Sequence, residues 1–201
     1  MRPLCLSVAV LLIDDSGSMA FEEGGERVSQ SDRLCCLSVM YTSGQPVHPT
    51  PRPPCLPFQI DDLKLILGRC AYAASLFDLD GIQVRFLNSN VEGNGIRDEA
   101  GAMNLLSQIR YSGLTPLGTS LDKKILQPLV LGPARAGRLE KPVLIIAITD
   151  GTPAGEPKDH IIRVISQADS ELKRSRYGPD AVSYQFAQVG TDLRAQAFLS
   201  E

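Results

Sequence analysis

The chain has no tryptophan, two histidines and few aromatic residues, and it also has no excess of positive charge. Its 201 residues include 20 lysines and arginines against 23 aspartates and glutamates, which gives a formal net charge of −3. A nucleic-acid-binding protein usually shows a basic stripe or patch, and none is indicated here. No apolar run is long enough to cross a bilayer. We therefore expect neither nucleic acid nor a membrane among the partners.

Cysteine is present, but its spacing indicates neither a disulfide framework nor a metal site. No CxxC pair occurs among the five cysteines, which are Cys5, Cys35, Cys36, Cys55 and Cys70. This usage predicts a reducing compartment, either the cytoplasm or the nucleus. Residues 1–13 also have the basic start and apolar core of a secretory signal, so secretion is the alternative. We favour a buried parallel strand there, because such strands are continuously apolar.

Segments with strand and helix patterns alternate along the chain. Apolar, β-branched runs predict strands, and apolar residues at three- and four-residue steps predict helices. The expected strands are 7–13, 81–88, 142–151 and 181–190, and the expected helices are 60–78, 97–110, 118–130, 157–176 and a last one opening near 191. Pro128 is expected to end or kink its helix. The alternation predicts one α/β domain over residues 1–201, with a central, mostly parallel sheet covered by helices on both faces.

Acidic and hydroxyl residues follow the first strand directly, in the stretch VLLIDDSGSM. Asp14, Ser16 and Ser18 stand at alternate positions and offer one carboxylate and two hydroxyls from a tight loop. These are hard oxygen ligands, which suit Mg²⁺ or Mn²⁺ and not zinc. Thr115 in SGLTPLGT and Asp150 in ITDG lie where further strand ends are expected. Ligands of parallel sheets bind at the carboxyl ends of strands, so these segments are predicted to meet at one rim.

Together, DxSxS, GLTPLGTSL and ITDG resemble the metal-ion-dependent adhesion site of von Willebrand factor A domains, in the order that family has them. FDLDGIQVRFLN and YQFAQVG are similar to segments of fungal members of the family. The resemblance implies the family's Rossmann-like fold. It also implies that Ser16 and Ser18 bind the metal directly and that Thr115 binds it in the binding-competent state, with Asp14 and Asp150 holding the metal's waters. Thr119 is the less favoured substitute for Thr115.

The resemblance implies an interaction module that is not an enzyme, in which an acidic side chain of a protein partner completes the coordination of Mg²⁺ or Mn²⁺. One alternative is a Mg²⁺-dependent phosphoryl-transfer or hydrolytic enzyme with Asp14 as nucleophile. That chemistry would need a second acid where Ser16 stands. A further alternative is an inactive, truncated product. Asp15, the unmatched acid, is expected to be a solvated or capping group and not a ligand.

Residues 28–59 differ from their surroundings, since they hold three of the five cysteines, many prolines and no useful period. They interrupt a loop that reads continuously from GGER to IDDLKL. One interpretation is a genuine, disordered insertion beside the rim; the one we favour is a translated intron or gene-model error, because Val-Ser and Pro-Phe-Gln can be encoded by splice signals. The resemblance also leads us to expect a final strand and helix beyond Glu201, so the domain is expected to be truncated at its carboxyl terminus.

Overall fold

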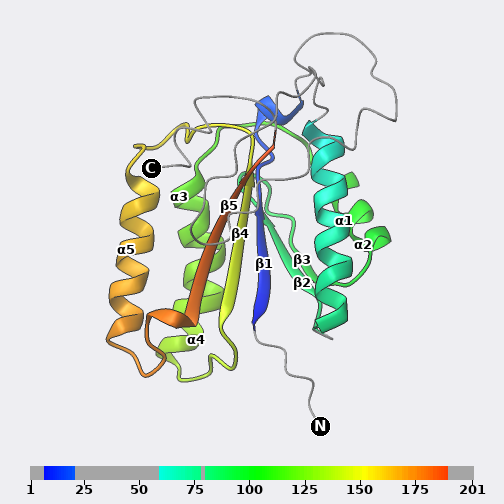
Figure 1. Cartoon of the computed structure of the whole chain (residues 1–201). Helices are drawn as coiled ribbons and strands as arrows, with labels where there is room; N and C mark the ends of the chain where they lie inside the picture. The colour runs from blue at the N-terminus through cyan, green and yellow to red at the C-terminus, as the bar shows by residue number, and fades with distance from the viewer. Residues whose placement is uncertain (1–6, 21–58, 78–79, 190–201) are drawn as a thin grey trace, which may run out of the picture.

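The computed structural model describes residues 7–20, 59–77 and 80–189 (Figure 1). In these residues it is an α/β fold with a single five-stranded sheet. The elements are β1 (Val8–Ile13), η1 (Gly17–Ala20), α1 (Gln59–Phe77), β2 (Ile82–Phe86), β3 (Gly93–Ile96), α2 (Glu99–Ser107), α3 (Leu117–Ser120), η3 (Leu121–Leu131), α4 (Gly132–Arg135), β4 (Val143–Thr149), α5 (His160–Lys173), η4 (Pro179–Ala181) and β5 (Val182–Gln188). The predicted class and the four predicted strands are confirmed. Most of residues 28–59 and the helix expected near 191 lie outside the described residues.

The strand order is β3-β2-β1-β4-β5, and β1 is therefore central. It pairs in parallel with β2 and β4, so that Ile13 lies opposite both Phe86 and Ile148. β5 continues the parallel arrangement beside β4, and only β3 is antiparallel. The predicted Rossmann-like, mostly parallel sheet is thus present, with a strand that the sequence pattern did not indicate.

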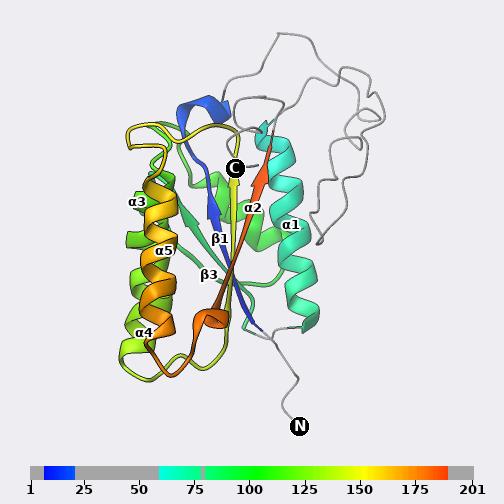
Figure 2. The same ribbon diagram turned by 60° about the vertical axis from the view of Figure 1, so that its left-hand side comes forward.

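Helices cover both faces of this sheet, with α1 and α2 on one side and α3, α4 and α5 on the other (Figures 1 and 2). Alternate residues of β1 enter two different cores. Val10 and Leu12 pack with residues of η3 and α5, whereas Leu11 and Ile13 pack with residues of α1 and α2. All four are completely buried. This explains why the first strand is apolar without alternation.

The helix predicted over residues 118–130 is longer than expected and passes through Pro128. Helical residues run without a break from Leu117 to Arg135, and the middle part, Leu121–Leu131, is a π-helix. In an α-helix the proline ring would clash with the carbonyl of Lys124, four residues earlier. The wider π spacing, seen where Gly132 N–H donates to the Gln127 carbonyl, accommodates the ring. Of the two alternatives predicted for Pro128, an end or a kink, the end is wrong, because helical residues continue to Arg135.

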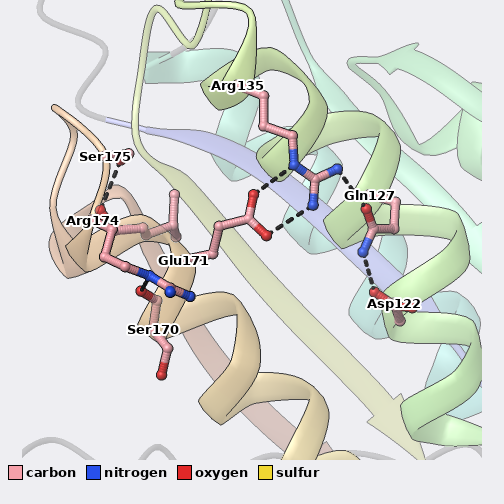
Figure 3. A network of polar contacts seen from close by, with 8 residues as sticks. Asp122, Gln127, Arg135, Ser170, Glu171, Arg174 and Ser175 are labelled. Atoms are coloured by element: carbon pink, nitrogen blue, oxygen red, sulfur yellow. Dashed lines mark hydrogen bonds and ion pairs between the residues drawn. The ribbon is translucent and has the colours of Figure 1, made fainter.

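A polar network joins this long helix to α5 on its solvent side (Figure 3). Arg135 donates two hydrogen bonds to Glu171, from Nε at 2.6 Å and Nη2 at 2.8 Å. The guanidinium also donates to Gln127, whose amide in turn donates to Asp122. The network ties the two helices together across the outside of their apolar contact.

Among the described residues, no helix combines the length and apolarity that a membrane crossing needs.

Candidate metal site

The strand order makes the carboxyl ends of β1 and β4 the topological switch point of the sheet. The chain leaves β1 towards β2 on one side, and it leaves β4 towards β5 on the other. Such a reversal of direction is where open α/β sheets bind ligands, because the two following loops diverge. Asp14 comes directly after β1, and Asp150 comes directly after β4. The expectation that these distant segments share a rim is met.

Asp14 is buried and held from three directions. Its N–H donates to the Ile148 carbonyl at 2.9 Å, which extends the pairing of β1 with β4 by one residue. Its Oδ1 accepts the Ser16 N–H at 2.9 Å, and its Oδ2 accepts the Thr149 hydroxyl at 2.6 Å. Burial raises the pKa of the Asp14 carboxyl, and the hydrogen bonds from Ser16 and Thr149 oppose that rise. The carboxylate is therefore oriented by its own loop and by the end of the neighbouring strand.

A chain of oxygen atoms connects the two loops. The hydroxyls of Ser16 and Ser18 lie 2.9 Å apart, and the Ser18 hydroxyl donates to Asp150 Oδ1 at 3.1 Å. Ser16 and Asp150 are almost fully buried, whereas Ser18 is exposed. Two hydroxyls and one carboxylate thus converge within contact distance, beside the oriented carboxylate of Asp14.

Thr115 reaches the same rim through its backbone neighbours. The carbonyl of Gly113 accepts the Gly17 N–H at 3.2 Å, which places the segment before Thr115 against the loop that carries the serines. Thr115 is 5% exposed, and its carbonyl accepts the N–H groups of Leu117 and Ala154. Hydrogen bonds therefore join four of the five predicted residues, Asp14, Ser16, Ser18 and Asp150, and place the segment of the fifth beside them.

The structure decides between the two alternatives that were predicted for Asp15. It was expected to be a solvated or capping group, and it is completely buried, so the solvated alternative is wrong. Its two carboxylate oxygens accept the backbone N–H groups of Asn88 and Ser89, each at 2.7 Å. These amides follow β2, beyond the last residue that pairs with β1. Asp15 is thus a capping group, but for a strand end that lies far away in the sequence.

Glu156 is a further residue of the rim, and no motif or spacing indicated it. Its carboxylate accepts the N–H groups of Gly118 and Thr119 at 2.6 and 2.9 Å, at the start of the long helix. It also accepts the Thr119 hydroxyl at 2.8 Å. Thr119, the less favoured candidate for a metal ligand, therefore has its hydroxyl directed to Glu156.

Lys124 places a positive charge at the end of β2. Its Nζ donates to the carbonyls of Phe86, Leu87 and Ser89 at 2.7, 3.1 and 2.7 Å. Burial lowers the pKa of this ammonium group, while the nearby charge of Asp15 opposes that change. The ammonium is thus held by backbone carbonyls and has no free direction toward the rim serines.

The donor set suits a hard divalent cation. Within residues 7–20, 59–77 and 80–189, no three His, Cys, Asp or Glu side chains gather as a metal-binding group. What the rim offers instead is two carboxylates, from Asp14 and Asp150, together with the hydroxyls of Ser16 and Ser18. Mg²⁺ prefers oxygen ligands, keeps several waters and needs only one or two carboxylates from a protein. The residues present therefore fit Mg²⁺ or Mn²⁺.

A scan of the chain against protein-family models finds no match, and no curated protein sequence matches it either.

Proposed function

We propose that this chain is a protein-interaction module of the von Willebrand factor A type, which binds Mg²⁺ or Mn²⁺ at the rim and, through it, an acidic side chain of a partner protein. The observation that carries the proposal is the contact between Ser18 and Asp150, two residues 132 positions apart. It brings oxygen donors of two loops together at the switch point of the sheet, where this topology favours a ligand. The DxSxS spacing, with Thr115 and Asp150 downstream, supports the same function.

In this proposal, Ser16, Ser18 and Thr115 hold the metal directly, and Asp14 and Asp150 hold its waters. The carboxylates of Asp15 and Glu156 are engaged by backbone N–H groups. Two carboxylates, those of Asp14 and Asp150, would therefore face the cation, which would keep affinity for an anionic oxygen from outside the chain. Leu114, which precedes Thr115, has a side chain that is 58% exposed. That side chain would offer apolar contact to the partner next to the metal.

The contacts of the rim support binding better than phosphoryl transfer. A nucleophilic aspartate needs a second acid to protonate the leaving group. The position two residues after Asp14 is Ser16, and the adjacent acid, Asp15, is engaged by two backbone N–H groups. Such an enzyme would also need a lysine near the site, and the ammonium of Lys124 is engaged by backbone carbonyls. These residues would have to leave their present partners to serve in catalysis.

The test is calorimetric titration of the full chain with MgCl₂ and with MnCl₂. Asp14→Ala and Ser18→Ala should abolish binding or weaken it at least about 10-fold, as loss of a ligand or of its immediate support does. Asp180→Ala is the matched control, because this exposed aspartate lies in η4, away from the rim. Equal binding by wild type and Asp14→Ala, or no binding by folded wild type, would contradict the proposal.

A further inference from the structure

One side chain, that of Asn88, connects three loops at the carboxyl edge of the sheet. Its Nδ2 donates to Asp15 Oδ1 at 3.2 Å, in the loop that carries the candidate metal ligands. The same Nδ2 donates to the Leu114 carbonyl at 2.8 Å, in the peptide group that directly precedes Thr115. Asn88 itself follows β2, where its backbone N–H is fixed by Asp15 at 2.7 Å. A single side-chain amide thus joins the loop that carries Ser16 and Ser18 (the serine loop) to residues 112–115, which include Thr115 (the threonine segment).

The threonine segment is shaped to receive this amide. Gly113 has a φ of +101°, a backbone conformation that suits glycine, and a Cβ at that position would lie 2.6 Å from Asn88 Oδ1. Any side chain there would push the amide away. The Gly113 carbonyl accepts the Gly17 N–H, and the Asp15 carbonyl accepts the Ser112 N–H at 2.8 Å. These two hydrogen bonds hold residues 112–113 against the serine loop, next to Asn88.

The other side of the segment is held by the loop that follows β4. The Ala154 N–H donates to the Thr115 carbonyl at 3.0 Å. Glu156 accepts from the first amides of the helix that begins at Leu117. This second attachment limits rotation of the segment as a whole, but it does not reach the Leu114 carbonyl. The Leu114 carbonyl is instead contacted by the Asn88 amide.

We propose that Asn88 is a positioning residue of the candidate metal site, which fixes Thr115 relative to Ser16 and Ser18. This rests on the proposed function for its metal-binding part. Groups that orient metal ligands without touching the metal commonly change metal affinity 10- to 100-fold when they are replaced. Asn88 does this across two loops at once, because its amide donates to both.

The experiment compares Asn88→Ala and the nearly isosteric Asn88→Asp with wild type, and uses Asn94→Ala as the matched control. Asn94 lies in β3, and its Oδ1 accepts a hydrogen bond from Arg85 of β2. Two quantities are measured on the full chain: Mg²⁺ affinity by calorimetry, and amide hydrogen exchange of Gly17 and Ser112 in metal-free protein. We expect both Asn88 variants to bind Mg²⁺ about 10- to 100-fold more weakly and to exchange these two amides faster. Asn94→Ala should match wild type in both.

The exchange measurement separates this inference from the proposed function. Wild-type Mg²⁺ affinity in Asn88→Ala, or unchanged exchange at Gly17 and Ser112, would overturn the positioning role even if the site binds metal. Should wild type bind no Mg²⁺, the proposed function fails, and the exchange rates alone then decide whether Asn88 holds the segment.

Discussion

The Thr149 hydroxyl donates a 2.6 Å hydrogen bond to Asp14 Oδ2, so the last residue of β4 orients the first residue after β1. Both residues are completely buried. Thr149→Val keeps the shape of the side chain and removes the donor. We expect it to lower the free energy of unfolding by roughly 2 kcal/mol, in the range for a hydrogen bond to a charged group. We also expect it to weaken Mg²⁺ binding about 10-fold. Urea denaturation and calorimetry measure the two effects.

Thr149→Ser is the conservative control, because it retains the hydroxyl and loses only a methyl group. It should recover most of the Mg²⁺ affinity that Thr149→Val loses. If Thr149→Ser bound the metal as weakly as Thr149→Val, the hydrogen bond to Asp14 would not be what orients the carboxylate.

Replacing Asp15 should destabilise the fold although the residue is no proposed ligand. Asp15→Ala leaves the N–H groups of Asn88 and Ser89 without their acceptor in a buried place. We expect a loss of about 3 kcal/mol in the free energy of unfolding, since two donors lose a charged partner. Urea denaturation measures this loss, and Asp180→Ala, at an exposed position, should change stability by less than about 0.5 kcal/mol. A similar small change for Asp15→Ala would show that these hydrogen bonds do not stabilise the strand end.

The buried hydroxyl of Tyr184 should be dispensable. It has no hydrogen-bond partner among the described residues, and burial raises the pKa of this phenol well above its ordinary value. Tyr184→Phe should therefore leave the free energy of unfolding unchanged or raise it by about 1 kcal/mol. Tyr177→Phe is the contrasting control and should lower it by about 1 kcal/mol, because the Tyr177 hydroxyl accepts from Leu139 N–H and from Arg176.

Tyr184 also predicts a pH dependence at high pH. The unfolded phenol ionises near pH 10, whereas the folded one stays protonated to higher pH. Ionisation of this phenol therefore does not affect the free energy of unfolding below about pH 10, and it lowers that free energy as the pH rises further. Melting curves from pH 8 to 11 should show a smaller alkaline loss in Tyr184→Phe than in wild type. Parallel curves for the two proteins would contradict the pKa direction.

The Arg135–Glu171 pair predicts a dependence at low pH. Its hydrogen bonds, with the charge of Arg135, lower the pKa of Glu171. The stabilisation is thus present above the unfolded pKa, about 4.3, and is lost as the pH falls through the folded value. Because the Arg135 side chain is 54% exposed, the effect should be small, about 2 °C or less in melting temperature. Glu171→Gln should melt below wild type at pH 7 and together with it near pH 3. A difference that persists at pH 3 would have another cause.

The helices were predictable from their apolar residues at three- and four-residue steps, and the parallel strands from their continuous apolar runs. Leu63 and Leu67 of α1, and Ile161 and Leu172 of α5, are buried as the helical spacing indicates. The antiparallel strand Gly93–Ile96 was not predictable in this way, because its sequence, GNGI, has no alternation. Packing explains it instead: a Cβ on Gly93 would lie 2.6 Å from Leu105 Cδ2.

The candidate site was predictable to the extent that its residues share short spacings at strand ends. The supporting residues were not, since their roles depend on partners that are distant in the sequence. Asp15 and Asn88 are 73 positions apart, and Glu156 and Gly118 are 38 apart. An acid or an amide in a loop is equally consistent with an exposed turn. Only the sheet order brings these partners together.

The sheet order also has a consequence for the sequence of events in folding. Asp14 and Thr149 are separated by 135 positions, so the rim exists only after the central strand has found β4 across most of the chain. Closing so long a loop is slow, although lengthening it further, as the segment between η1 and α1 does, adds little entropy cost. A ligand that binds only the assembled rim stabilises the folded state and not the states that precede it. We expect Mg²⁺ to slow unfolding while leaving the folding rate nearly unchanged.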